Sequence, residues 1–223
     1  MTSVYERALG KDFEHLHPRL RERYGFDSTD RMICVGTGRM ERIDNNALAR
    51  PVLTVLAPRD LPFPETGQDI PLTIRTYAVE NRSREEIVFR RSFDVRDDSP
   101  RRFDARMSYD PGRECIVDAL GRGGRLVSEL HPSVTDGGGL YIGSGRQYVR
   151  TPAGTIRIPE PLRAEVGVYE RYDEGAERFR IRVTVTNRLL GFVFGYAGHF
   201  TIEWRDCASV PTAVRHVGGG SIP

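Results

Sequence analysis

Residues 178–185 read RFRIRVTV, and this stretch decides the fold class. Its odd-numbered positions are all apolar, while its even-numbered positions carry arginine or threonine. Because successive side chains of an extended chain point to opposite faces, this alternation is typical of a strand with one buried and one solvated face. The stretch therefore predicts an antiparallel sheet that covers an apolar core.

The same period of two returns through the chain from about residue 70 onward. It is clearest in residues 87–95, 103–109 and 196–204. The turn sequences Asp-Pro-Gly at 110–112 and Asp-Glu-Gly at 173–175 suit short hairpins. We count about nine strands and no alternation of strand and helix, so a parallel nucleotide-binding sheet is not expected. Open sheet edges invite aggregation, so we predict a mainly β protein built on a closed antiparallel β-barrel, calycin-like or similar.

Helical periodicity is confined to two parts of the chain. Within the first 25 residues, apolar side chains recur every three or four positions, and Ser3 and Glu6 have the spacing of a capping box. Because Pro18 interrupts this part, we predict one or two short N-terminal helices. A further helix is predicted near residues 46–57, in which Pro51 either lies in the first turn or causes a kink.

The length of 223 residues suits a single all-β domain. We assign residues 1–210 to one barrel domain that includes the N-terminal helices. Residues 211–223 contain three consecutive glycines, Gly218–Gly220, and are predicted to form a flexible tail.

Composition excludes several classes of protein. The chain is 39% hydrophobic and 29% charged, which is too apolar for disorder and too charged for a membrane protein. No stretch approaches the roughly 20 apolar residues that span a bilayer, and the N-terminus lacks the pattern of a signal peptide. The net charge is +2 and the arginines alternate with acids, so we expect no nucleic-acid partner and no membrane insertion. We therefore expect a cytoplasmic protein whose three separated cysteines are reduced.

Familiar chemical motifs are incomplete in this chain. Gly36-Thr37-Gly38 begins like a dinucleotide-binding loop, but Glu41 stands where the third glycine belongs. His15 and His17 are two positions apart, so on a helix they point to different sides and cannot share a metal ion. We accordingly predict neither a metal site nor a cofactor.

Three charged residues, Arg91, Asp118 and Glu170, share a strand face with apolar neighbours. A charge that faces an apolar interior is costly unless it is paired. One interpretation is an internal ion pair, for example of Arg91 with Glu170 or with Asp118. The other is that the three side chains hold or polarise a ligand, which makes them the candidate catalytic residues. A bulge upstream of any of them would move that charge to the opposite face.

The same inward face presents aromatic and hydroxyl groups. The tyrosines at 77, 109, 148 and 196 are candidates for lining a cavity. Our candidate ligand-binding residues are Tyr196, Tyr109, Tyr77, Phe89, Phe103, Met107, Phe194 and Trp204. The most apolar stretch, LLGFVFGY at 189–196, is expected either to close one barrel end or to form a lid over an apolar ligand.

Short motifs along the chain carry a resemblance to a family. They are YERALG at 5–10, LHP at 16–18, FPETG at 63–67, RRFDA at 101–105, VDALG at 117–121, ERYD at 170–173 and GFVFGY at 191–196. With these motifs the chain resembles the bacterial domain-of-unknown-function 4166 family over roughly residues 4–207. Members of that family are sometimes fused behind a saccharopine-dehydrogenase-like reductase. The resemblance implies no catalytic residues.

Two functional hypotheses follow. In the first, the barrel binds a small hydrophobic molecule of natural-product type and catalyses its isomerisation or cyclisation without a cofactor, as in secondary metabolism. In the second, the barrel is a non-catalytic carrier or an accessory module for a separate NAD(P)-dependent reductase. A homodimer is compatible with either hypothesis. Replacing Glu170 by Gln tests the first: turnover should be lost at an unchanged melting temperature, whereas a large loss of stability would indicate an ion pair.

Overall fold

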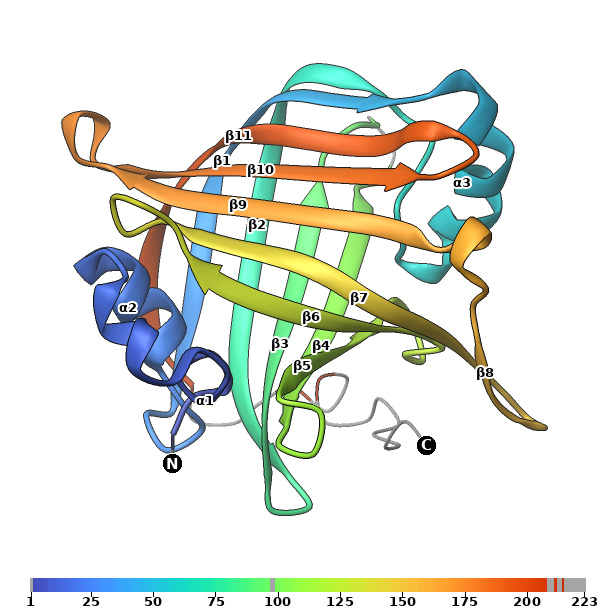
Figure 1. Ribbon diagram of the computed structural model, residues 1–223. Coiled ribbons are helices and arrows are strands. Elements are labelled where there is room, and N and C mark those ends of the chain that lie inside the picture. Colours follow the sequence, from blue (N-terminus) through green and yellow to red (C-terminus); the bar gives the residue numbers. More distant parts are fainter. Residues whose placement is uncertain (1, 97–98, 208–210, 212–213, 215–223) are drawn as a thin grey trace.

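A computed structural model describes every residue except 1, 97–98, 208–210, 212–213 and 215–223. One antiparallel sheet closes on itself, and short helices lie at both of its ends (Figure 1). The predicted mainly β, antiparallel barrel is therefore confirmed.

The strands are β1 (Met32–Asn45), β2 (Gly67–Asn81), β3 (Arg84–Phe93), β4 (Arg101–Asp110), β5 (Cys115–Leu120), β6 (Leu126–Val134), β7 (Leu140–Thr151), β8 (Gly154–Arg157), β9 (Ala164–Asp173), β10 (Arg178–Asn187) and β11 (Gly191–Asp206). The α-helices are α1 (Val4–Leu9), α2 (Pro18–Gly25) and α3 (Arg50–Leu56). Five short 3-10 helices are η1 (Gly10–His15), η2 (Ala47–Ala49), η3 (Ala57–Arg59), η4 (Glu160–Leu162) and η5 (Glu174–Ala176).

Ten strands form the closed barrel, in the order β6-β5-β4-β3-β2-β1-β11-β10-β9-β7. Pairing of β6 with β7 closes the ring, and β8 adds to β7 outside it. This is close to the number of strands expected from the alternation. The stretch 178–185 lies within β10, and its four apolar side chains are all buried.

The first and last strands pair along most of their length. In β1 and β11, Met32 lies opposite Asp206 and Asn45 lies opposite Phe194. Gly36-Thr37-Gly38 belongs to β1, so it is part of the barrel wall and not a phosphate-binding loop.

The predicted N-terminal helices are present and cover one end of the barrel (Figure 1). The Ser3 hydroxyl accepts a hydrogen bond from the Glu6 backbone N–H at 3.0 Å, which caps α1 as expected from the capping-box spacing. Pro18 occupies the first turn of α2, where its missing N–H costs nothing. Helix α1 packs on β4, β5 and β6, and α2 packs on β9.

The opposite end carries α3, which confirms the helix predicted near 46–57. The segment that follows α3 places Phe63, which is fully buried, between the two sides of the barrel. The Phe63 ring centroid lies 5.4 Å from that of Phe93 on β3 and 5.2 Å from that of Phe194 on β11. Helical segments that precede β2 thus lie at both ends of the barrel.

The predicted flexible tail, including Gly218–Gly220, lies outside the described residues apart from Pro211 and Val214. Val214 is buried on the outer face of the barrel against Tyr77, Val79 and Val88.

Candidate functional site

Four polar side chains from four different strands point into the barrel. Arg91 lies on β3, Asp118 on β5, Glu170 on β9 and Tyr196 on β11. Asp118, Glu170 and Tyr196 are buried, and Arg91 is partly exposed. The parity of the strand residues thus places all three predicted charges in the interior.

Both carboxylate oxygens of Glu170 are engaged by helix α2. The Arg23 Nε donates to Glu170 Oε1 at 2.9 Å, and the Tyr24 hydroxyl donates to Glu170 Oε2 at 3.0 Å. The side chains of Arg23 and Glu170 are each only 2% exposed, so this is a fully buried ion pair. The geometry favours the ion-pair interpretation of Glu170, with a partner from the N-terminal helices instead of Arg91.

Arg23 is held from several sides. Its Nη1 lies 3.5 Å from Cys34 Sγ, and its guanidinium carbon lies 4.7 Å from the centroid of the Phe200 ring. Burial by itself lowers the pKa of Arg23, but the Glu170 carboxylate more than offsets this and the net pKa is raised. Sequence reasoning missed Arg23, although it stands three positions after Leu20 and therefore on the apolar side of α2.

Asp118 differs from Glu170 because one oxygen of its carboxyl group is buried without a partner among the described residues. It is 4% exposed, and its buried Oδ1 has no hydrogen-bond partner among the described residues. Its cross-strand neighbours are Met107 on β4 and Ser128 on β6. Burial raises the pKa of Asp118 from 3.8 to about 7, and the positive charge of Arg91 offsets only part of that effect. Near neutral pH this carboxyl group can therefore either accept or donate a proton.

Arg91 lies between aromatic rings on the inner wall. Its guanidinium carbon is 4.6 Å from the ring centroid of Phe103 and 5.6 Å from that of Phe89. The Arg91 guanidinium also acts on the Tyr196 hydroxyl. Burial raises the pKa of Tyr196, and the positive charge of Arg91 works against this rise. Arg91 therefore packs against two aromatic rings, and its positive charge acts on both the Tyr196 hydroxyl and the Asp118 carboxyl group.

Tyr5 of α1 completes the polar set. Its hydroxyl donates to Met107 Sδ at 3.3 Å, beside the position of Asp118. Burial and then the Asp118 carboxylate raise the pKa of Tyr5, so its phenol stays protonated. We call Arg91, Asp118, Tyr196 and Tyr5 the interior polar cluster.

The other predicted ligand-binding residues divide into two groups. Phe89, Phe103, Met107 and Phe194 are buried in the barrel core, while Tyr109 and Trp204 pack at its edge. Trp204 contacts α2, because its Nε1 donates to Glu22 Oε1 at 2.7 Å.

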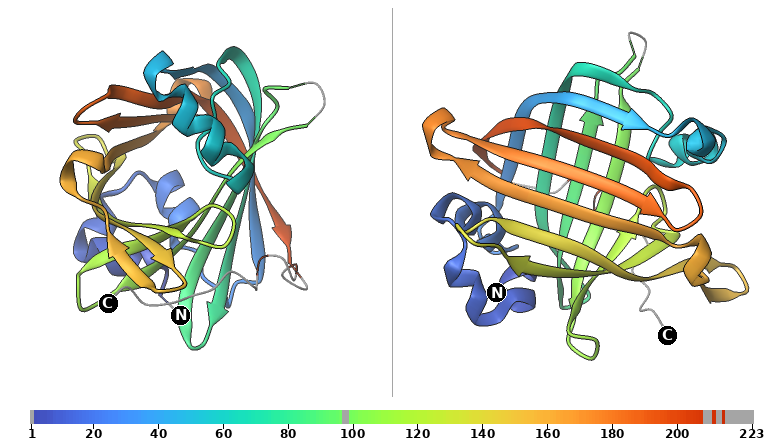
Figure 2. Two further views of the ribbon diagram at one scale, coloured as in Figure 1. Left: turned by 90° about the vertical axis from the view of Figure 1, so that its right-hand side faces the viewer. Right: turned by 45° about the horizontal axis from the view of Figure 1, so that its top comes forward.

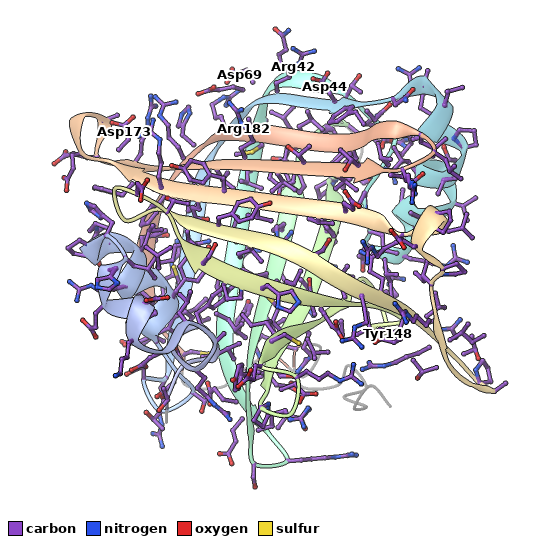
Figure 3. The ribbon with its side chains drawn as sticks, in the orientation of Figure 1. Arg42, Asp44, Asp69, Tyr148, Asp173 and Arg182 are labelled. Atoms are coloured by element: carbon purple, nitrogen blue, oxygen red, sulfur yellow. The ribbon has the colours of Figure 1, made fainter. Side chains whose placement is uncertain are left out.

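Two of the predicted tyrosines lie on the outer face of the barrel. Tyr77 packs there with Val79, and Tyr148 packs with Cys115 and Val117 (Figure 3 labels Tyr148). At these points both faces of the wall are buried, so alternation in the sequence could not distinguish inside from outside.

Some side chains on the inner face of the barrel remain partly accessible to solvent. Val166 and Val168 on β9 and Leu120 on β5 pack against the core but remain only partly buried. Beside them, β7 and β9 pair directly only from Leu140–Gly143 to Gly167–Glu170. Beyond that point side chains replace the backbone ladder: Val166 N–H donates to Ser144 Oγ at 2.8 Å, and Gln147 exchanges two hydrogen bonds with the Ala164 backbone.

A surface pocket of about 520 Å³ lies apart from this cluster. It is lined by Ser28, Thr29, Arg31, residues 78–82 and Arg106. The Arg106 guanidinium is already paired with Glu86, so we place the candidate site in the interior instead.

Within the part of the chain that is described, no three His, Cys, Asp or Glu side chains gather closely enough to bind a metal ion. Nor does any described helix have the length and apolar character needed to cross a bilayer.

Comparison with known proteins supplies a family. A family model described as "Domain of unknown function (DUF4166)" matches residues 16–200. The uncharacterized protein YndH of Bacillus subtilis (strain 168) is 34% identical over 208 residues, which is 92% of this chain and 100% of that protein. No solved structure matches the chain.

Proposed function

This chain belongs to the DUF4166 family, and we propose that its barrel binds a small, largely apolar molecule whose polar group contacts Asp118. The observation that carries the proposal is the Asp118 carboxyl group, which is buried and has an oxygen without a partner among the described residues. A buried polar atom that is left unsatisfied costs about 1–3 kcal/mol, so its retention suggests a role.

The surroundings of Asp118 support an apolar ligand. The inward faces of the strands are dominated by aliphatic and aromatic side chains, and Val166, Val168 and Leu120 retain accessible surface. A ligand against these side chains would bury apolar area, and the interior polar cluster would orient it.

A proton-transfer reaction is the specific chemistry that Asp118 favours. With a pKa of about 7, the carboxyl group is close to half protonated at neutral pH. Arg91 could stabilise negative charge that develops on the substrate, and the Tyr196 hydroxyl could orient it. We therefore propose a cofactor-independent isomerisation or cyclisation as the reaction, with a natural-product type of substrate.

Native mass spectrometry of the protein purified from its own host tests the binding proposal. The expected result is a bound small molecule that is lost on denaturation, with lower occupancy in the Asp118→Asn variant. If that variant retains the molecule but no longer converts it, Asp118 acts in catalysis. If neither wild type nor variant converts it, the barrel is a carrier.

A fluorescent apolar probe, N-phenyl-1-naphthylamine, tests the location. We expect saturable binding that is lost in Val168→Trp, where the new ring fills the inner wall of β9. Arg182→Trp is the matched control, because Arg182 is exposed on the outside of the neighbouring strand β10 (Figure 3). Absence of both a bound molecule and saturable probe binding would rule out the proposal.

A further inference from the structure

The end of the barrel that carries α3 is surrounded by four surface segments. They are residues 46–59, which include α3, the turn 121–125, residues 149–163, which include β8 and η4, and the turn 187–192. The left view of Figure 2 looks onto this end. We call these four segments the arginine rim.

Hydrogen bonds join the segments of the arginine rim into a closed ring. The bonds are Arg122 N–H to Arg59 O at 2.7 Å, Arg150 N–H to Arg125 O at 2.8 Å, Asn187 Nδ2 to Pro161 O at 3.0 Å and Asn46 Nδ2 to Leu190 O at 2.9 Å. The rim is therefore one continuous surface although its segments are far apart in the sequence.

Exposed apolar side chains of the described residues concentrate on this rim. All six large apolar side chains that are more than half exposed belong to it: Leu48, Val52, Val55, Ile156, Leu162 and Leu189. Leu48 is 72% exposed and Leu189 is 68% exposed. A concentration of this kind at one end of a molecule marks an interaction surface.

The rim also concentrates positive charge. Its four segments contain eight arginines and a single acidic residue, Glu160, which gives a net charge of +7 in a chain whose total is +2. Glu160 lies 3.7 Å from Arg188, and Asp60, just behind the rim, lies 3.4 Å from Arg122. Glu165, which follows the third segment, lies 3.7 Å from Arg163. Three carboxylates thus pair with rim arginines, and the eight arginines still leave an excess of positive charge on the rim.

We propose that the arginine rim docks the barrel end-on against the surface of an anionic phospholipid bilayer. Apolar side chains would enter the headgroup region while the arginines contact lipid phosphates, as in other interfacial proteins. The apolar side chains come from separate elements and are interleaved with arginines, which suits a fluid lipid surface better than the flat apolar core of a protein interface.

This docking is shallow and leaves the barrel outside the bilayer. The expectation of no membrane insertion considered spanning segments only, and end-on docking needs none. The proposal rests on the rim alone, so it stands or falls independently of ligand binding in the interior.

Vesicle co-sedimentation tests the proposal. The intact protein is mixed with vesicles of phosphatidylcholine alone or with about 30% phosphatidylglycerol, at about 0.1 M salt. We expect binding to the anionic vesicles, little binding to the neutral ones, and a loss of binding as the salt concentration rises.

Two rim variants separate the contributions of arginine charge and of apolar contact to vesicle binding. Arg125→Gln/Arg157→Gln should weaken binding about 30-fold, because each arginine at an anionic surface strengthens binding roughly fivefold. Leu48→Ser/Leu189→Ser should weaken it by about tenfold through lost apolar contact. All four side chains are exposed, so the melting temperature should not change.

Matched controls lie on the outer wall away from the rim. Tyr141→Ser removes an exposed aromatic ring from β7, and Arg182→Gln removes an exposed arginine from β10. Neither should alter vesicle binding.

Several results would overturn the proposal. They are equal binding to neutral and anionic vesicles, unchanged binding by both rim variants, and no vesicle binding at all. If the protein instead forms a dimer that Leu48→Ser/Leu189→Ser disrupts, the rim is a self-interface. If the protein binds a single-stranded oligonucleotide more tightly than anionic vesicles at the same salt concentration, the rim is a nucleic-acid-binding surface.

Discussion

At the scale of single residues, Asp118 and Glu170 show how one fold gives two buried carboxyl groups opposite roles. Glu170 has an arginine and a phenol on its two oxygens. Asp118 faces the interior with an oxygen that no described residue satisfies. The first arrangement stabilises a charge, and the second keeps a carboxyl group near neutrality and available for a ligand.

Asp118 predicts a pH dependence of stability. Its pKa is raised in the folded state, from 3.8 to about 7, so the folded protein binds a proton that the unfolded chain releases. The contribution of Asp118 to stability is therefore fully present below about pH 4 and is lost as the pH rises to about 7, by up to roughly 4 kcal/mol.

Urea unfolding of wild type and Asp118→Asn at about pH 4 and about pH 8 measures this contribution. The variant should lose less stability between the two pH values and should be the more stable protein at the higher one. Other titrating groups cancel in the comparison. Parallel pH profiles for the two proteins would show that the Asp118 carboxyl group is not buried in solution.

At the scale of elements, the N-terminal helices are part of the barrel core. Tyr5 on α1 and Leu20 on α2 are buried at 1% and 0% exposure, and Arg23 on α2 pairs with Glu170 on β9. The helices therefore supply both apolar area and the counter-charge for Glu170. A strand charge paired from a helix is invisible to reasoning about strands alone.

The link between α2 and β9 can be measured with a double-mutant cycle. Arg23→Met leaves the Glu170 carboxylate buried and unpaired, so we expect a loss of about 3–5 kcal/mol in the free energy of unfolding. The double variant Arg23→Met/Glu170→Met should recover most of that loss, because no buried charge remains.

The control for this cycle is Asp69→Asn, which breaks the exposed pair with Arg39 (Figure 3 labels Asp69). Its effect should stay below about 1 kcal/mol. An Arg23→Met protein as stable as wild type would contradict the structural role of the buried pair.

At the scale of the whole molecule, pairing of β1 with β11 joins the two ends of the chain in one sheet, so we expect the barrel to unfold as one cooperative unit. These strands stand at opposite ends of the chain, and they approach each other closely at Gly38. A Cβ atom added there would lie 2.0 Å from the His199 carbonyl oxygen and 2.5 Å from Phe200 Cα. Both neighbours are backbone atoms, so a side chain at this position forces the strands apart.

Gly38→Ala should therefore lower the free energy of unfolding by about 1–3 kcal/mol or more. The matched control is Gly175→Ala in η5, where the nearest neighbour would be Asp173 Oδ1 at 3.7 Å. Fluorescence of Trp204, the single tryptophan, and far-UV circular dichroism should report the same lowered midpoint. Separate transitions for the two signals would show that the barrel unfolds in parts.

The sequence by itself determined the class of fold, the two helical regions and the inward direction of Arg91, Asp118, Glu170 and Tyr196. Those features follow from periods of two and of three to four residues, which are local properties of the chain. Where a strand is buried on both faces, a period of two no longer indicates which face points into the barrel. The predicted interior position of Tyr77 is wrong for this reason.

Only the tertiary structure decided which charged side chains contact one another. Arg23 and Glu170 are 147 residues apart, and no local pattern reports their contact. The same holds for the unsatisfied oxygen of Asp118 and for the closed ring of arginine-bearing segments around α3. The physical reason is that pairing of charges depends on distances across the barrel, which the closure of the sheet sets and the order of residues does not.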